Sequence, residues 1–125
     1  MKRIIIVEKD FIIALALKKG IQRLGHEVTA ILDNGKAAIA KVKQGAVDLV
    51  LMEIRLFGEI DGIEAMNHIR KISDVPVIFL TGNTDESTKK RAMETNPAGF
   101  LIKPLQKDTL KEIFRKTVGE NQNNN

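Results

Sequence analysis

Polar side chains able to do chemistry directly follow four of the short apolar runs in this sequence. They are two acids, a hydroxyl and an amine, with a further lysine and aspartate beside the first acid: Glu8, Lys9, Asp10, Glu53, Thr81 and Lys103. Carboxylates that meet a hydroxyl and an ammonium group are able to bind a divalent cation and a phosphoryl oxygen. A single charged residue after a strand is more often the solvated start of a loop, so only the positions taken together indicate a site.

The apolar runs are the elements that must position these residues. They span residues 4–7, 47–52, 75–80 and 99–102, with 27–32 as a weaker candidate, and the largely continuous apolar character of the first four predicts strands buried on both faces. The segments between them predict helices over residues 10–24, 34–44, 61–72, 84–95 and 108–118, of which 84–95 is expected to be the most exposed. Strict alternation predicts a three-layer α/β fold with a parallel sheet, and ligands of such sheets bind beyond the carboxyl ends of the strands.

The length and residue types narrow the class of protein. The chain has 125 residues, which is room for one domain of ordinary size, expected over residues 1–119 with a polar tail or linker start over 120–125. It contains no cysteine, which excludes disulfides, thiolate catalysis and Cys-bound zinc. It shows no signal-peptide pattern, and no apolar run approaches the ~18 residues of a membrane span, so we expect a cytoplasmic protein without membrane contact.

The charge and the aromatic content argue against nucleic-acid binding by this domain alone. The formal net charge is +4, and the basic residues are spread along the chain instead of gathering in one segment. The chain has no Trp and no Tyr, so it offers little surface for stacking bases. His26 and His68 have no partner at metal-ligand spacing, and we expect ordinary surface or helix roles for both.

Four segments together resemble a response-regulator receiver domain, the phosphorylation switch of two-component signalling. The segments are IIIVEKD, DLVLMEIRL with GEIDGIEA, VPVIFLTGNTDE and GFLIKPL, and the resemblance covers about residues 2–118. It implies a flavodoxin-like (βα)5 sandwich with a five-stranded parallel sheet of order 2-1-3-4-5. It also implies Mg²⁺ as the cofactor, a histidine kinase or other signalling protein as the partner, and a signalling module that is not an enzyme.

The resemblance assigns a role to each of the strand-end residues. Glu53 takes the position of the phosphoacceptor, and Glu8 with Lys9 takes the position of the acidic pair that holds Mg²⁺, with Asp10 beside them. Thr81 and Phe100 take the switch positions, and Lys103 takes the position of the amine that contacts the phosphoryl group. Pro104 after that lysine is a candidate for a cis peptide bond.

Two of these positions depart from the family where its chemistry is most demanding. The acceptor is Glu53 instead of Asp, and the second metal carboxylate is replaced by Lys9. Lys9 removes an oxygen ligand and adds a repelling cation, so Mg²⁺ is expected to bind weakly or not at all, with Glu8 and Glu53 as its only candidate ligands. The extra methylene of Glu53 matters as well, because ~1 Å of misplacement can cost ~100-fold in rate. A milder departure is Phe57, where a Pro is usual.

These departures favour a receiver that works independently of phosphorylation, through protein–protein contacts. Its bias toward an active-like or an inactive-like state stays open, as do its cognate kinase and whether the chain stands alone. A homodimer through the fourth helix, fifth strand and fifth helix is one possible partner arrangement. The alternatives are a conventional phosphoaccepting, Mg²⁺-dependent response regulator and, from another class, a phosphatase-type or flavin-binding enzyme on the same fold.

Overall fold

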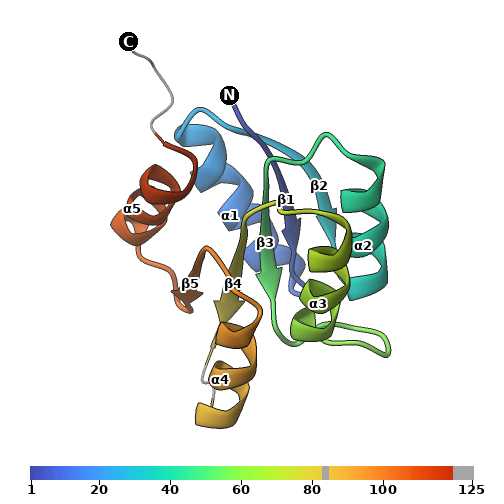
Figure 1. The fold of residues 1–125 in the computed structure, drawn as a ribbon. Coiled ribbons are helices and arrows are strands. Elements are labelled where there is room, and N and C mark those ends of the chain that lie inside the picture. The colour runs from blue at the N-terminus through green and yellow to red at the C-terminus, as the bar shows by residue number, and fades with distance from the viewer. Residues whose placement is uncertain (83–84, 120–125) are drawn as a thin grey trace.

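Strands and helices alternate along the chain in the computed structural model, which describes residues 1–82 and 85–119 (Figure 1). The strands are β1 (Arg3–Val7), β2 (Glu27–Leu32), β3 (Leu49–Glu53), β4 (Val77–Thr81) and β5 (Gly99–Ile102). The helices are α1 (Phe11–Arg23), α2 (Gly35–Gln44), α3 (Gly62–Ile72), α4 (Glu86–Glu94) and α5 (Lys107–Val118). The predicted alternation of strands and helices is confirmed.

The strands form one parallel sheet in the order β2-β1-β3-β4-β5, as predicted. The order reverses at β1, because the chain moves outward to β2 on one side and then crosses back to β3 on the other. In open sheets of this kind a crevice forms at the carboxyl ends of the strands beside the reversal. Glu8 follows β1 and Glu53 ends β3, so the two acids meet at this crevice.

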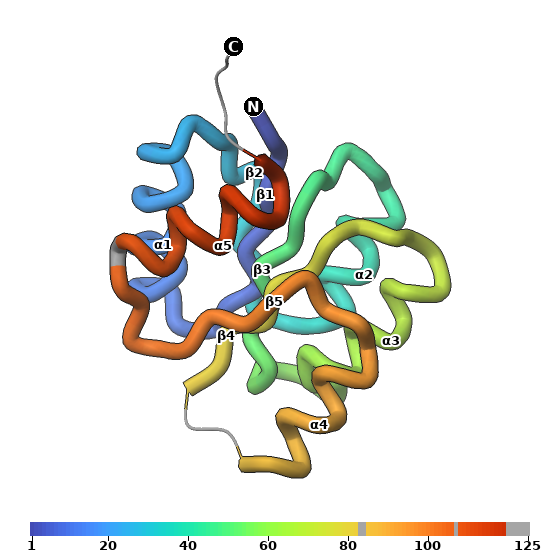
Figure 2. The backbone as a smooth tube through the Cα atoms, turned by 60° about the vertical axis from the view of Figure 1, so that its left-hand side comes forward, coloured from blue at the N-terminus to red at the C-terminus, as the bar shows by residue number. Residues whose placement is uncertain are grey.

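The helices cover the sheet on both faces and bury two apolar cores. One core lies under α1 and α5, with Leu17, Ile21 and Phe114 against it. The other lies under α2, α3 and α4, and includes Met66 and Ala92. Figures 1 and 2 show α1 and α5 together on one side of the sheet and α2 and α3 together on the other. The central strands β3 and β4 are buried along their whole length, which agrees with their continuous apolar sequence.

The helices begin where capping side chains predict. Asp10, Asn34, Asp61 and Asp85 accept hydrogen bonds from backbone N–H groups in the first turns of α1, α2, α3 and α4, respectively. Gly45, with φ of 85°, ends α2. Two of these caps lie close to the strand-end residues of the crevice, since Asp10 follows Glu8 by two positions and Asp85 follows Thr81 by four.

Some predicted boundaries differ from the observed ones. The predicted strand 75–80 begins later, at Val77, because Pro76 has no N–H to donate to the neighbouring strand. The predicted helix 84–95 is α4, which begins at Glu86, and Thr84 and the predicted tail 120–125 lie outside the described residues. Ala92 is the one buried side chain among the described residues of α4, so the expected exposure of this helix is confirmed. Among residues 1–82 and 85–119, no helix is both long and apolar enough to cross a bilayer.

Candidate functional site

The strand ends hold a cluster of two carboxylates around one ammonium group. Lys103 Nζ lies 2.6 Å from Glu53 Oε1 and 2.5 Å from Glu8 Oε1. The Glu8 side chain is fully buried, at 0% exposure, while that of Glu53 is 10% and that of Lys103 is 18% exposed. One cation therefore balances two acids in a largely water-free crevice.

Each member of the cluster comes from a different strand end. Glu8 follows β1, and its backbone N–H donates to the carbonyl of Leu32 in β2 at 2.8 Å. Glu53 ends β3, the neighbour of β1 in the sheet. Lys103 follows β5, and its N–H donates to the carbonyl of Thr81 at 2.8 Å, so its side chain begins at the rim next to β4. The peptide bond between Lys103 and Pro104, the candidate position, is cis.

Backbone N–H groups hold the remaining carboxylate oxygens. Glu8 Oε2 accepts from the N–H of Asp10 at 2.9 Å, and Glu53 Oε2 accepts from the N–H of Lys9 at 3.2 Å. Glu8 Oε1 has only its charge contact with Lys103, without hydrogen-bond geometry. The loop after β1 thus binds both acids through its main chain.

Burial and mutual contact separate the titration of the two acids. Burial raises the pKa of Glu8, and its hydrogen bond with Glu53 raises it further. Burial acts in the same direction on Glu53, but hydrogen bonds from Glu8, Lys103 and the N–H of Lys9 outweigh it and lower the pKa of Glu53. Burial lowers the pKa of Lys103, while the contacts with Glu53 and Glu8 more than offset it, so the pKa is raised. The amine stays charged, and Glu53 carries the negative charge opposite it.

Two predicted members of the acidic pocket turn their charged groups elsewhere. Lys9 Nζ donates to the backbone carbonyl of Arg55 at 3.1 Å, so its ammonium group does not meet Glu53. Asp10 Oδ1 accepts from the N–H groups of Ile12 and Ile13 at 3.0 and 3.2 Å, respectively, as the N-cap of α1. The sequence left the direction of Asp10 open, and the structure assigns its carboxylate to the helix.

Of the two switch positions, Thr81 lines a small cavity next to the cluster, and Phe100 packs against the apolar core under α2, α3 and α4. Thr81, at the end of β4, is buried and lines this cavity of about 200 Å³ together with Glu53 and Lys103. Phe100 on β5 is half-buried, and its ring centroid lies 5.7 Å from that of Phe79. The ring therefore packs toward the core that underlies the cavity.

The sequence analysis missed three residues of the cavity wall. Arg55, Asp85 and Thr88 also line it. Asp85 caps α4 by accepting from the N–H of Thr88 at 2.8 Å, and its pKa is lowered chiefly by its contacts with Thr88. The three-residue spacing from Asp85 to Thr88 is a helix-start signal after β4, and it could have placed this turn at the rim.

Phe57, the milder departure, makes a contact that a proline cannot make. Its N–H donates to the carbonyl of Asp33 at 3.1 Å, which ties the loop after β3 to the loop after β2. Asn34 and Phe57 form an isolated parallel bridge at the same place. The Phe57 ring is 57% exposed, so the substitution leaves an apolar side chain at the rim of the crevice.

The carboxylates at the place where the resemblance implies Mg²⁺ are engaged by other groups of the chain. Mg²⁺ prefers several oxygen ligands in octahedral geometry. The crevice offers two carboxylates, and both contact Lys103, while the carboxylate of Asp10 is engaged as a helix cap. In the part of the chain that the structure describes, no three His, Cys, Asp or Glu residues form a metal-binding group.

Comparison with known proteins agrees with this fold. Residues 4–115 match the response regulator receiver domain family. The chain belongs to this family. Its similar proteins include the uncharacterized transcriptional regulatory protein YrkP of Bacillus subtilis, 36% identical over 86% of this chain and 46% of that protein. They also include the chemotaxis protein CheY of the same organism, 32% identical over 93% of this receiver domain and 97% of that protein.

Solved structures show the same fold. The signal receiver domain of a modulated diguanylate cyclase from Desulfovibrio desulfuricans is 31% identical, with a TM-score of 0.87 and 94% of each chain covered. The receiver domain of the sensor histidine kinase PA1611 from Pseudomonas aeruginosa, described with magnesium coordinated in its active site cleft, is 25% identical. Its TM-score is 0.85, with 95% of this chain and 98% of that chain covered. The flavodoxin-like fold of this receiver domain is therefore shown.

The family identifies the chain as a signalling module of two-component systems. Receiver domains of this family interact with histidine kinases and effector domains. This receiver domain spans about half the length of the transcriptional regulators YrkP and YvcP, at 46% and 52% of those proteins.

Proposed function

We propose that this receiver domain signals without phosphorylation, as a module held in one state that acts through protein–protein contacts. The observation that carries the proposal is the ion-paired cluster at the acceptor position. Lys103 Nζ, the group expected to contact a phosphoryl oxygen, already contacts Glu53 and Glu8 at 2.6 and 2.5 Å. The Glu53 carboxylate thus already supplies the negative partner that Lys103 would otherwise find in a phosphoryl group.

The charges of the crevice support weak Mg²⁺ binding. A cation added to the cluster meets two carboxylates whose charge Lys103 partly cancels, and Lys9 adds a second positive group near the rim. Phosphoryl transfer depends on positioning and on metal neutralisation of the developing charge. With the metal bound weakly and the acceptor lengthened by one methylene, transfer to Glu53 is expected to be very slow.

The switch residues support an inward, active-like state as the one that is held. Thr81 is buried against the cavity, and Phe100 packs on Phe79. In this proposal the Glu53 carboxylate takes the place of an aspartyl phosphate as the partner of Lys103. The surface presented to partners is then the one made by α4, β5 and α5, through which a homodimer also forms.

Phosphorylation by a small-molecule donor tests the proposal. Incubating the chain with acetyl phosphate and Mg²⁺ is expected to leave its intact mass unchanged. The double variant Lys9→Asp/Glu53→Asp, which restores both carboxylates of the family pattern, is expected to gain one phosphoryl group under the same conditions. A phosphoryl adduct on Glu53 of the unaltered chain would refute the proposal and favour a conventional receiver.

A further inference from the structure

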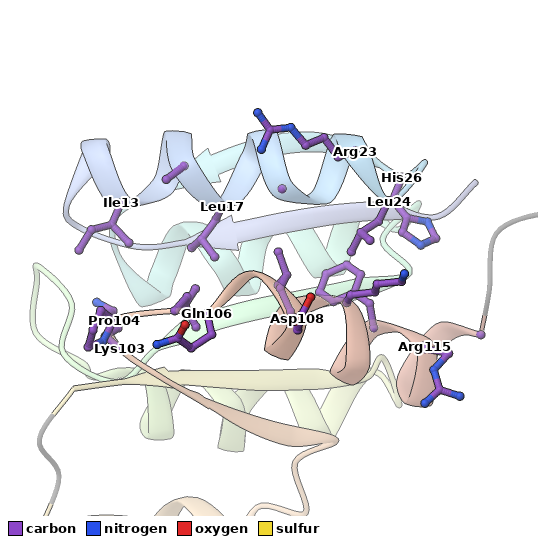
Figure 3. Close-up of a pocket in the computed structure, with 17 residues that line it drawn as sticks. Ile13, Leu17, Arg23, Leu24, His26, Lys103, Pro104, Gln106, Asp108 and Arg115 are labelled. Atoms are coloured by element: carbon purple, nitrogen blue, oxygen red, sulfur yellow. The ribbon is translucent and has the colours of Figure 1, made fainter.

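A second groove, separate from the cavity beside Thr81, runs between α1 and α5. Its volume is about 1140 Å³, well above that of the cavity beside Thr81 (Figure 3). Its buried floor is apolar, formed by Leu17, Leu110 and Phe114. Small-molecule sites are typically concave and apolar, with a few placed polar groups, and this groove has that form.

The groove extends along the axis of α1. On α1 its lining runs from Ile13 to Leu24, and eleven residues of helix rise span roughly 16 Å. Figure 3 shows Ile13 and Leu17 pointing from α1 toward α5. The two helices meet closely at one point, since a Cβ on Gly20 would lie 2.8 Å from Leu110 Cδ2. A straight aliphatic chain matches this shape better than a compact ring system.

One end of the groove holds a buried histidine, which corrects the ordinary surface or helix role expected for it. His26 is only 6% exposed, lines the groove, and lies 5.8 Å from the Phe114 ring, centroid to centroid. Its Nδ1 accepts a hydrogen bond from the N–H of Lys2 at 3.1 Å. Burial, the N-terminal charge and Lys2 lower the pKa of His26, so the ring is neutral. Its proton therefore lies on Nε2, which is a donor at this end of the groove.

Basic side chains outnumber acidic ones in the lining of the groove. The lining contains four cationic side chains and one acid, Asp108. Two of the cations are engaged elsewhere, Lys103 with Glu53 and Arg115 with Glu112, and Arg23 points away from the groove in Figure 3.

Lys111 is the cation left for a ligand at the His26 end. It is exposed on α5, three residues before Phe114, and residues at this spacing share one helix face. Lys111 therefore lies on the same face of α5 as Phe114, whose ring lies next to that of His26.

We propose that the α1–α5 groove binds a linear aliphatic carboxylate, with its chain along Leu17, Leu110 and Phe114 and its carboxylate at His26 and Lys111. The apolar floor accounts for the chain, and the Nε2 donor and the ammonium group account for the acidic head. The lining segment also includes Lys103 and Pro104, so the bound ligand contacts the same backbone that carries the amine of the acceptor crevice.

A titration of the full chain with sodium decanoate, followed by ¹H–¹⁵N NMR below the concentration at which the probe aggregates, tests this proposal. Saturable shifts are expected at amides of residues 13–24 and 105–119, with a dissociation constant of about 100 μM or lower. Sodium acetate, which is the head group alone, and decyltrimethylammonium, which reverses the charge, are expected to produce no saturable shifts at these amides.

Matched variants separate the groove from other surfaces. Ala16→Trp fills the groove from an exposed position of α1, and it is expected to weaken binding at least tenfold, while Lys19→Trp on the same helix leaves binding unchanged. Lys111→Glu is expected to weaken binding several-fold, and Lys116→Glu, outside the lining, leaves it unchanged.

Several results would overturn the proposal. They are the absence of saturable shifts, equal binding of the cationic probe, or binding that survives Ala16→Trp. Spectra and thermal unfolding of each unliganded variant establish that it is folded.

Discussion

Lys103 and Glu53 meet at 2.6 Å although fifty positions separate them in the chain. The same ammonium contacts Glu8, whose side chain is completely buried. A buried carboxylate is tolerated only when it is paired or neutral, so Lys103 is the group that allows two acids to share this crevice.

Removing the amine is expected to destabilise the fold at neutral pH. Breaking a buried ion pair by deleting one partner costs about 3 kcal/mol, and Lys103→Met leaves both acids without their cation. Urea unfolding at pH 7 measures this loss, with the exposed Lys116→Met as control. Without the cation, the lowering effect of Lys103 on the pKa of Glu8 and Glu53 is lost, and burial raises the pKa of both carboxyls in the folded state. The lost stability should therefore return as the pH falls below them, and a deficit that stays constant down to pH 4 would contradict the ion-pair account.

Restoring the two missing carboxylates is expected to create a metal site. NMR titration of the unaltered chain with Mg²⁺ should show no sub-millimolar binding at Glu8 and Glu53. Lys9→Asp/Glu53→Asp should bind Mg²⁺ about tenfold or more tightly, because it supplies another oxygen ligand and removes a cation. The control is Lys43→Asp at an exposed position of α2, which makes the same change in net charge away from the crevice. Equal gains in both variants would mean that net charge alone controls binding.

The start of α3 is expected to tolerate no side chain at Gly62. An added Cβ would lie 2.1 Å from the carbonyl oxygen of Glu53, which is a backbone atom and cannot rotate away. Gly62→Ala should therefore cost about 3 kcal/mol and lower Tm by about 10 °C in a calorimetric scan. Gly82→Ala is the matched control, since a Cβ there meets no atom within 4 Å. Equal Tm values for the two variants would show that the α3 start can shift freely.

His26 is expected to make the fold sensitive to mild acid. The lowered pKa means that the folded state binds the proton less readily than the unfolded chain does. The stability that the neutral His26 gives to the folded state is therefore present above the ordinary pKa of 6.5. It is lost as the pH falls through the folded-state pKa of His26. Urea midpoints at pH 7.5 and 5.5 should differ more in the unaltered chain than in His26→Gln. The control is His68→Gln on an exposed part of α3, and a pH dependence that is the same in His26→Gln would disprove the assignment.

A dimer through α4, β5 and α5 is expected to depend on exposed apolar side chains. Ile102 at the end of β5 is 66% exposed, and Met93 on α4 is 55% exposed. Sedimentation velocity should show a dimer that dissociates on dilution, and Ile102→Glu should abolish it. Ile72→Glu makes the same change at a 49% exposed position on α3 and should leave the dimer intact. A monomer at every concentration would rule out this surface as a self-association site.

The order of elements could be predicted from the sequence because apolar periodicity is a local property. The runs at 4–7 and 99–102 match β1 and β5 closely, and capping residues such as Asn34 and Asp61 mark the helix starts. The strand ends also identified the residues of the crevice, since parallel strands bring their carboxyl ends to one edge. The strand predicted over 75–80 begins at Val77 instead, because the missing N–H of Pro76 limits strand pairing more strongly than apolar character promotes it.

The sequence by itself therefore determined the fold, the family resemblance and the strand ends that carry Glu8, Glu53 and Lys103. Only the tertiary structure decided where their charged groups point. Lys9 Nζ donates to the carbonyl of Arg55, Asp10 caps α1, and Lys103 joins both acids. The physical reason is that each polar group takes the best partner within reach. Arg55, Glu8 and Glu53 lie more than forty positions along the chain from the lysines that contact them, so no local sequence pattern predicts these contacts.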